Sequence, residues 1–103
     1  MLETALSALV EELKQTEEFI NYKNTFAAIE NDEQAMRCVD DIRKLNMRVQ
    51  EMGEEEYERE SENLAAKMEE LCSDARVADF IMAEVDFSKL YQHITDTIIG
   101  ALD

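Results

Sequence analysis

Proline is absent from this 103-residue chain, and glycine occurs only twice, as Gly53 and Gly100. A fold rich in β-sheet needs turn glycines and runs of β-branched residues, and this sequence has neither. Most positions carry Ala, Leu, Glu, Lys, Met, Arg or Gln, which lose little side-chain freedom in a helix. The composition therefore predicts an all-α protein.

Basic residues are also scarce, because 10 Lys and Arg stand against 25 Asp and Glu, which gives a net charge of −15. This charge repels phosphate backbones and anionic lipid head groups, so direct binding of nucleic acid or of a membrane surface is disfavoured. Apolar residues make up 46% of the chain, which is enough for a folded core. The length has room for a single helical domain spanning residues 1–103.

Long hydrophobic segments are missing too. No apolar run approaches the roughly 20 residues that a membrane-spanning helix requires. The first 13 residues are amphipathic and include Glu3, Glu11 and Glu12, unlike the basic start and apolar centre of a secretory signal. We expect a soluble, cytoplasmic protein.

Residues that usually carry catalysis or bind metals are few. His93 is the only histidine and has no partner at the spacing of a catalytic triad or zinc site. The glycine-rich loops of cofactor sites are absent, so we predict no catalytic, cofactor-binding or metal-binding residues, and no enzyme. Cys38 and Cys72 lie on predicted helices and are interpreted as small buried apolar residues. The alternative is a redox or metal sensor in which the hairpin described next brings these two cysteines together.

Heptad periodicity is the strongest positive signal. The pattern alternates at steps of three and four in two segments, first at Ala35, Cys38, Ile42, Leu45, Val49 and Met52, and then at Tyr57, Ser61, Leu64, Met68 and Leu71, all apolar except Ser61. Gly53 falls between the segments at a position suited to a helix C-terminal cap. Two such segments joined by a short turn predict a long antiparallel helical hairpin.

Three further helices are predicted around this hairpin. Apolar residues recur at helical spacing in residues 2–13 and 19–29, and the last helix should run from Asp74 to about Ile99. Thr16 is a suitable N-cap for the second helix, Asn31 with Gln34 resembles a capping box for the third, and Ser73 or Asp74 suits the last. The prediction is a bundle of about five helices, the first two short.

The last helix has a wider apolar surface than one neighbour can cover. Residues on one of its faces are therefore our candidates for an oligomer or partner interface, namely Phe80, Glu84, Phe87, Tyr91, Ile94 and Ile98. Within this face Glu84 must either reach solvent or be paired, because an unpaired buried charge is costly. The candidates for pairing are Arg76 and Lys89 of a partner subunit.

The stretch "LKQTEEFINYKNTFAAIENDEQA", the glycine turn and the ending "ARVADFIMAEVDFSKLYQHITDTIIGAL" resemble the YlbF/YmcA family of small helical proteins from Firmicutes. The resemblance covers nearly the whole chain. It implies self-association and regulation through protein contacts, since some members act in a complex that influences competence, sporulation and biofilm formation and assists an mRNA-processing endoribonuclease. Certain members carry C-terminal cysteines linked to an iron–sulfur cluster, whereas this chain has no cysteine after Cys72.

Together these observations predict a non-enzymatic regulatory or adaptor protein. We expect a homo-oligomer, most simply a dimer, whose partners are related family proteins or an RNA-processing enzyme. We expect no cofactor, no direct nucleic-acid binding and no membrane binding.

Overall fold

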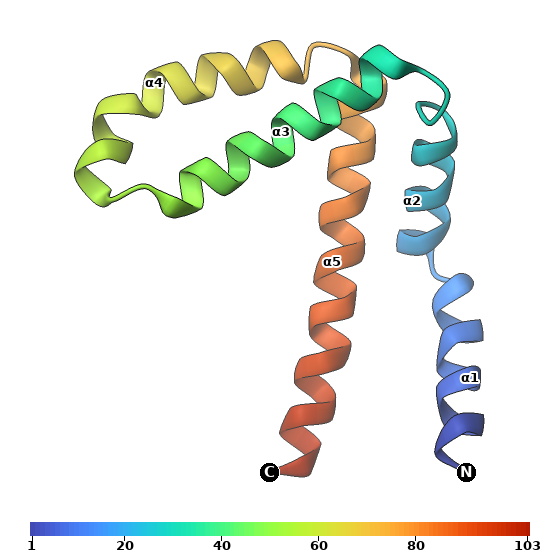
Figure 1. Cartoon of the computed structure of the whole chain (residues 1–103). Helices are drawn as coiled ribbons and strands as arrows, with labels where there is room; N and C mark the ends of the chain where they lie inside the picture. The colour runs from blue at the N-terminus through green and yellow to red at the C-terminus, as the bar shows by residue number, and fades with distance from the viewer. The chain divides into compact units, whose positions relative to one another are not determined.

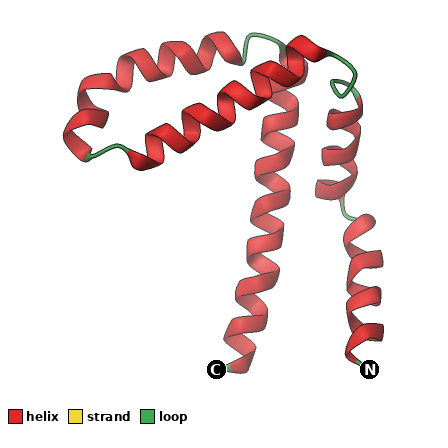
Figure 2. Cartoon of the chain, in the orientation of Figure 1, coloured by secondary structure: helices red, strands yellow, loops and turns green.

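The computed structural model describes all 103 residues and contains five α-helices and no strand (Figures 1 and 2). The helices are α1 (Leu2–Lys14), α2 (Glu17–Ala27), α3 (Glu33–Glu51), α4 (Glu54–Leu71) and α5 (Ala75–Leu102). The predicted all-α fold with five helices, the first two short, is confirmed. No helix combines the length and hydropathy that crossing a lipid bilayer would require.

The chain forms two compact units. Residues 1–27 and 80–103 make up unit 1, which holds α1, α2 and most of α5. Residues 28–79 make up unit 2, which holds the α3–α4 hairpin and the first turn of α5.

Three of the helices start at a residue whose side chain caps the first turn. The Thr16 hydroxyl accepts a hydrogen bond from the Phe19 N–H at 3.2 Å, and an Asp74 carboxylate oxygen accepts one from the Arg76 N–H at 2.9 Å. At the start of α3 the predicted cap Asn31 is wrong, because Asp32 occupies that position and accepts from the N–H groups of Gln34 and Ala35. The capping rule thus located the starts of α2, α3 and α5 to within one residue.

The turn of the hairpin differs from the prediction in its backbone geometry. Gly53 has φ −72° and ψ 162°, so it is extended and serves as the N-cap of α4. The left-handed conformation that a C-terminal capping glycine adopts does not occur here, because no glycine in the chain has a positive φ. Met52, also extended, is the C-cap of α3. The chain therefore turns through two extended residues.

We expect Gly53→Ser to raise the free energy of unfolding by about 0.5–1 kcal/mol. Gly53 supplies no side-chain cap to α4, its backbone suits an N-cap serine, and a Cβ added there meets no atom within 4 Å. A serine would accept a hydrogen bond from the first turn and would restrict the unfolded chain. Urea denaturation measures the effect. A loss of stability would show that this turn needs glycine.

The buried apolar side chains of unit 2 lie away from the turn of the hairpin. Buried residues of α3 are Ala35, Val39 and Ile42, and those of α4 are Leu64 and Leu71. Ile29 before α3 and Val77 in α5 are also fully buried. Val49 and Met52, near the turn, are only half-buried. Side chains of the hairpin are thus more deeply buried away from the turn than next to it.

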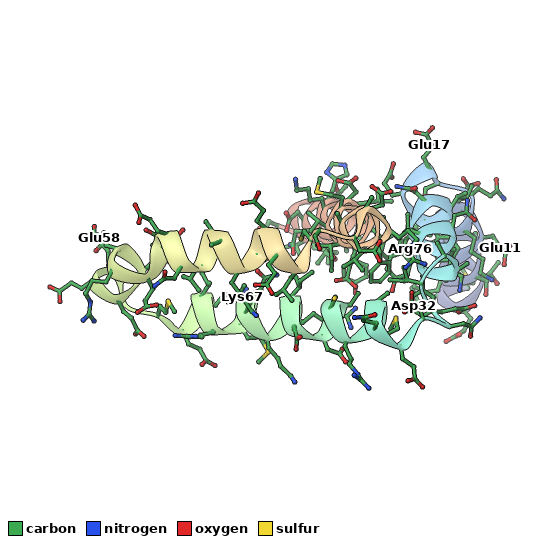
Figure 3. All side chains as sticks on the ribbon, turned by 90° about the horizontal axis from the view of Figure 1, so that it is seen from above. Glu11, Glu17, Asp32, Glu58, Lys67 and Arg76 are labelled. Atoms are coloured by element: carbon green, nitrogen blue, oxygen red, sulfur yellow. The ribbon has the colours of Figure 1, made fainter.

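Arg76 joins the starts of two helices in unit 2. Its guanidinium Nη2 lies 2.8 Å from Asp32 Oδ2 and 2.9 Å from Asp74 Oδ2, and its Nη1 donates to the Ala28 carbonyl oxygen at 3.4 Å (Figure 3). Asp32 is the N-cap of α3, and Asp74 caps the first turn of α5. Hydrogen bonds from Arg76 hold the pKa of both carboxyl groups below the usual value. One side chain therefore ties together elements 44 residues apart in sequence.

This cluster should make stability depend on pH. A carboxyl group with a lower pKa in the folded chain stabilises the fold above its unfolded pKa, and this contribution disappears as pH falls through the folded pKa. The loss should therefore begin below about pH 4, the unfolded value for aspartate. We expect Arg76→Gln to lose less stability on acidification than the unmodified chain, as measured by urea midpoints at pH 7 and pH 3. Lys23→Gln, which removes an exposed cation from α2, is the control and should leave the pH dependence unchanged.

Candidate interaction surface

Five aromatic rings hold α2 against α5 within unit 1. Phe80 of α5 contacts Tyr22 and Phe26 of α2, with ring centroids 5.6 and 5.7 Å apart. Phe87, two turns further along α5, contacts Phe19 and Tyr22 at 5.8 and 5.6 Å. Offset and tilted ring pairs at this distance are favourable beyond the area that they bury. This aromatic cluster therefore fixes which face of α5 meets α2.

The face of α5 that meets α2 continues beyond the cluster but is uncovered there. Tyr91 and Ile98 follow Phe87 at spacings of four and eleven, which place them on the same side of the helix. Tyr91 is 62% exposed and Ile98 is 51% exposed, whereas Phe80 is 1% exposed. Leu102, one turn after Ile98, is 82% exposed. The apolar face is thus buried at its start, half-buried at Ile94, and exposed at Tyr91, Ile98 and Leu102.

A second uncovered apolar surface lies on α1 in the same unit. No residue of α1 is buried, and Leu2, Leu6 and Val10 are exposed at spacings of four, on one face of the helix. Scattered exposed apolar residues are ordinary, but two helices with uncovered apolar faces in one small unit are typical of an interaction site. We name this set the distal face, defined as Leu2, Leu6, Val10, Tyr91, Ile98 and Leu102.

Charge is also low along the distal face. Residues 90–102 contain one acidic residue, Asp96, and residues 1–10 contain one, Glu3, although the whole chain has 25. The remaining 23 acidic residues therefore lie elsewhere in the sequence. The two sequence segments that carry the distal face therefore hold little of the negative charge of the chain.

The six interface candidates predicted from the sequence divide into three groups. Phe80 and Phe87 contact rings of α2, and Phe80 is fully buried by the chain itself. Glu84 and Ile94 are half-buried, while Tyr91 and Ile98 are exposed and belong to the distal face. The residues of α1 were not among the candidates. The signal for these residues in the sequence was the helical periodicity of Leu2, Leu6, Leu9 and Leu13. That periodicity does not indicate whether another element of the chain covers them.

The residues considered for catalysis, metal binding or redox chemistry are not part of the distal face. His93 is exposed on α5. Cys38 in α3 and Cys72 at the C-cap of α4 are free, half-buried thiols in unit 2. Side chains of His, Cys, Asp and Glu form no group of three that could hold a metal ion.

The fold is all-helical, and the distal face leaves part of its apolar surface uncovered. Comparison with known proteins gives its family: residues 2–103 match the model described as "Control of competence regulator ComK, YlbF/YmcA", and the chain belongs to this family. The family resemblance inferred from the sequence is confirmed.

Individual relatives are distant. A UPF0342 protein of Staphylococcus saprophyticus is 22% identical over 98 residues, which cover 92% of this chain and 86% of the relative. A UPF0342 protein of Staphylococcus epidermidis is 24% identical with the same coverage. No solved structure matches the chain. The comparisons therefore give a regulatory family and leave the partner open.

Proposed function

We propose that this chain is a non-enzymatic regulatory or adaptor protein that pairs with a second copy through the distal face and acts by contacting a larger protein. The observation that carries the proposal is the continuation of the α2-contacting face of α5 into exposed residues such as Tyr91 and Ile98. An apolar face of that kind is stabilised when another helix covers it. A second copy supplies both α1 and α5 as covering helices, which would complete a four-helix arrangement.

The regulatory part of the proposal is supported by the family. Its description names control of the competence regulator ComK, which is a regulatory role. Modulation of mRNA processing, and through it of competence, sporulation or biofilm formation, is the finer proposal that the family resemblance supports. Comparing transcript ends between cells with and without the gene tests it, and identical ends would contradict a role in RNA processing.

Light scattering across a dilution series tests the self-association. A mass twice that of the single chain, kept on dilution, is the expected result, because the uncovered apolar face favours pairing. A monomer at all concentrations would contradict the proposed pairing. The distal face would then be free for a different protein.

The redox or metal sensor is the alternative, and it uses different residues. It needs the free, half-buried thiols of Cys38 and Cys72 to react together. Mild oxidation followed by mass spectrometry separates the two proposals, because a disulfide within the chain would support the sensor. Retention of both free thiols would count against it.

A further inference from the structure

A groove of about 540 Å³ runs between α3 and α4 in unit 2. Three leucines line it: Leu45 of α3 is half-buried, and Leu64 and Leu71 of α4 are buried. On both helices the lining residues recur at spacings of three, four and seven, so they form one face of each helix. The groove therefore follows the helix axes, which is the shape that receives another helix.

Cations gather along this groove in a chain that has few of them. Lys44, Arg48 and Lys67 all line it, and they are three of the ten basic residues. Lys44 and Arg48 form no ion pair within the chain. Lys67, labelled in Figure 3, has its Nζ 3.9 Å from Oε2 of the exposed Glu70, and an exposed pair at this distance contributes little to stability. The side chains that could bind an acidic partner are therefore available.

Two carboxylates, Asp41 and Glu60, also line the groove, so its charged residues sum to one positive charge in a chain of net charge −15. An extended phosphate backbone would meet both carboxylates and would make no apolar contact with the three leucines. A helix with one apolar face and carboxylates beside it would pack its apolar side chains against the three leucines and place its carboxylates near the cations. The groove thus favours a protein helix over RNA.

We propose that the α3–α4 groove binds an amphipathic helix of a partner protein, with apolar residues on Leu45, Leu64 and Leu71 and flanking carboxylates on Lys44, Arg48 and Lys67. The inference rests on the proposed function, in which the chain acts by contacting a larger protein, and it names the chemistry of that partner. The groove lies in unit 2, whereas the distal face lies in unit 1. Partner binding and self-association therefore use different residues.

The probe is a fluorescent synthetic peptide of about four helical turns with leucines at spacings of three and four and glutamates beside them. Anisotropy is measured with the full chain. We expect saturable binding that weakens about tenfold or more in the Arg48→Glu, Lys67→Glu double variant, since both changes reverse a charge at the rim. The matched control is Arg59→Glu, which reverses an exposed charge on α4 outside the groove and should leave binding unchanged.

Three results would overturn the proposal. The first is absence of binding, or equal binding to the unmodified chain and the double variant. The second is equal or tighter binding of a peptide of residues 1–15, which would assign the groove to α1 of a second copy. The third is tighter binding of a single-stranded RNA oligonucleotide at the same groove residues.

Light scattering of the double variant separates this proposal from the one on which it rests. An unchanged dimer mass with lost peptide binding supports both. A dimer that never binds the peptide overturns only the groove, and a monomer that binds the peptide overturns only the self-association.

Discussion

Phe80→Ala should lower the free energy of unfolding by about 3–5 kcal/mol, the range for truncating a buried phenylalanine. Phe80 is the largest fully buried side chain, and its ring contacts Tyr22 and Phe26 of α2. Removing the ring leaves a cavity and separates α2 from the start of the apolar face of α5. Urea denaturation followed by circular dichroism measures the loss.

Tyr57→Ala is the matched control for this result. Tyr57 is an aromatic residue of α4 that is 48% exposed and takes part in no ring pair. Its truncation should change the free energy of unfolding by no more than about 0.5 kcal/mol, as surface substitutions usually do. Equal losses from the two variants would show that the aromatic cluster does not hold α2 on α5.

The helices were predictable because their signals are local. The hairpin segments and the caps at Thr16 and Asp74 follow from residues within one or two turns of each other. A strict heptad places Cys38 on the buried side of α3, but the structure buries Val39 and leaves Cys38 half-buried. Positions three and four residues after Ala35 both lie on the same side of an α-helix as Ala35, so the spacing alone does not decide between Cys38 and Val39.

The choice between Asn31 and Asp32 as N-cap depended on a distant residue. Both side chains can cap a helix, and they are adjacent. In the structure Asp32 also binds Arg76, which lies 44 residues away and also binds Asp74. A carboxylate can accept from Arg76 and from the backbone together, whereas an amide offers no charge to the guanidinium. The residues next to Asp32 in the sequence do not indicate that Arg76 binds it.

An exposed apolar part of α5 was predicted, but its extent was not. The sequence shows that the apolar surface of α5 is wider than one neighbouring helix can cover. The structure identifies α2 as the first such neighbour. With 11 residues, α2 spans about 16 Å, and α5 with 28 residues spans about 42 Å. The shorter helix can cover only part of the longer one. Which candidates remain exposed therefore depends on where α2 lies along α5, and that position is fixed by the aromatic cluster.

Ile98→Glu should convert the proposed dimer into a monomer or weaken it by a factor of about 100 or more, because an unpaired charge buried at an interface costs several kcal/mol. Ile98 lies near the middle of the exposed half of α5, where a covering helix of the second copy would desolvate it. Light scattering across the same dilution series measures the change. Circular dichroism should show unchanged helix content, since Ile98 is exposed in the single chain.

Met82→Glu provides a control on the same helix. Met82 is 60% exposed, similar to Ile98, but its spacing of two from Phe80 places it away from the face that meets α2. The same apolar-to-acidic change at this position should therefore leave the dimer intact. If Met82→Glu dissociated the dimer and Ile98→Glu did not, the pairing face would lie on the other side of α5. Dissociation by both variants would instead point to the added negative charge as the cause, because two copies of a chain with net charge −15 already repel each other.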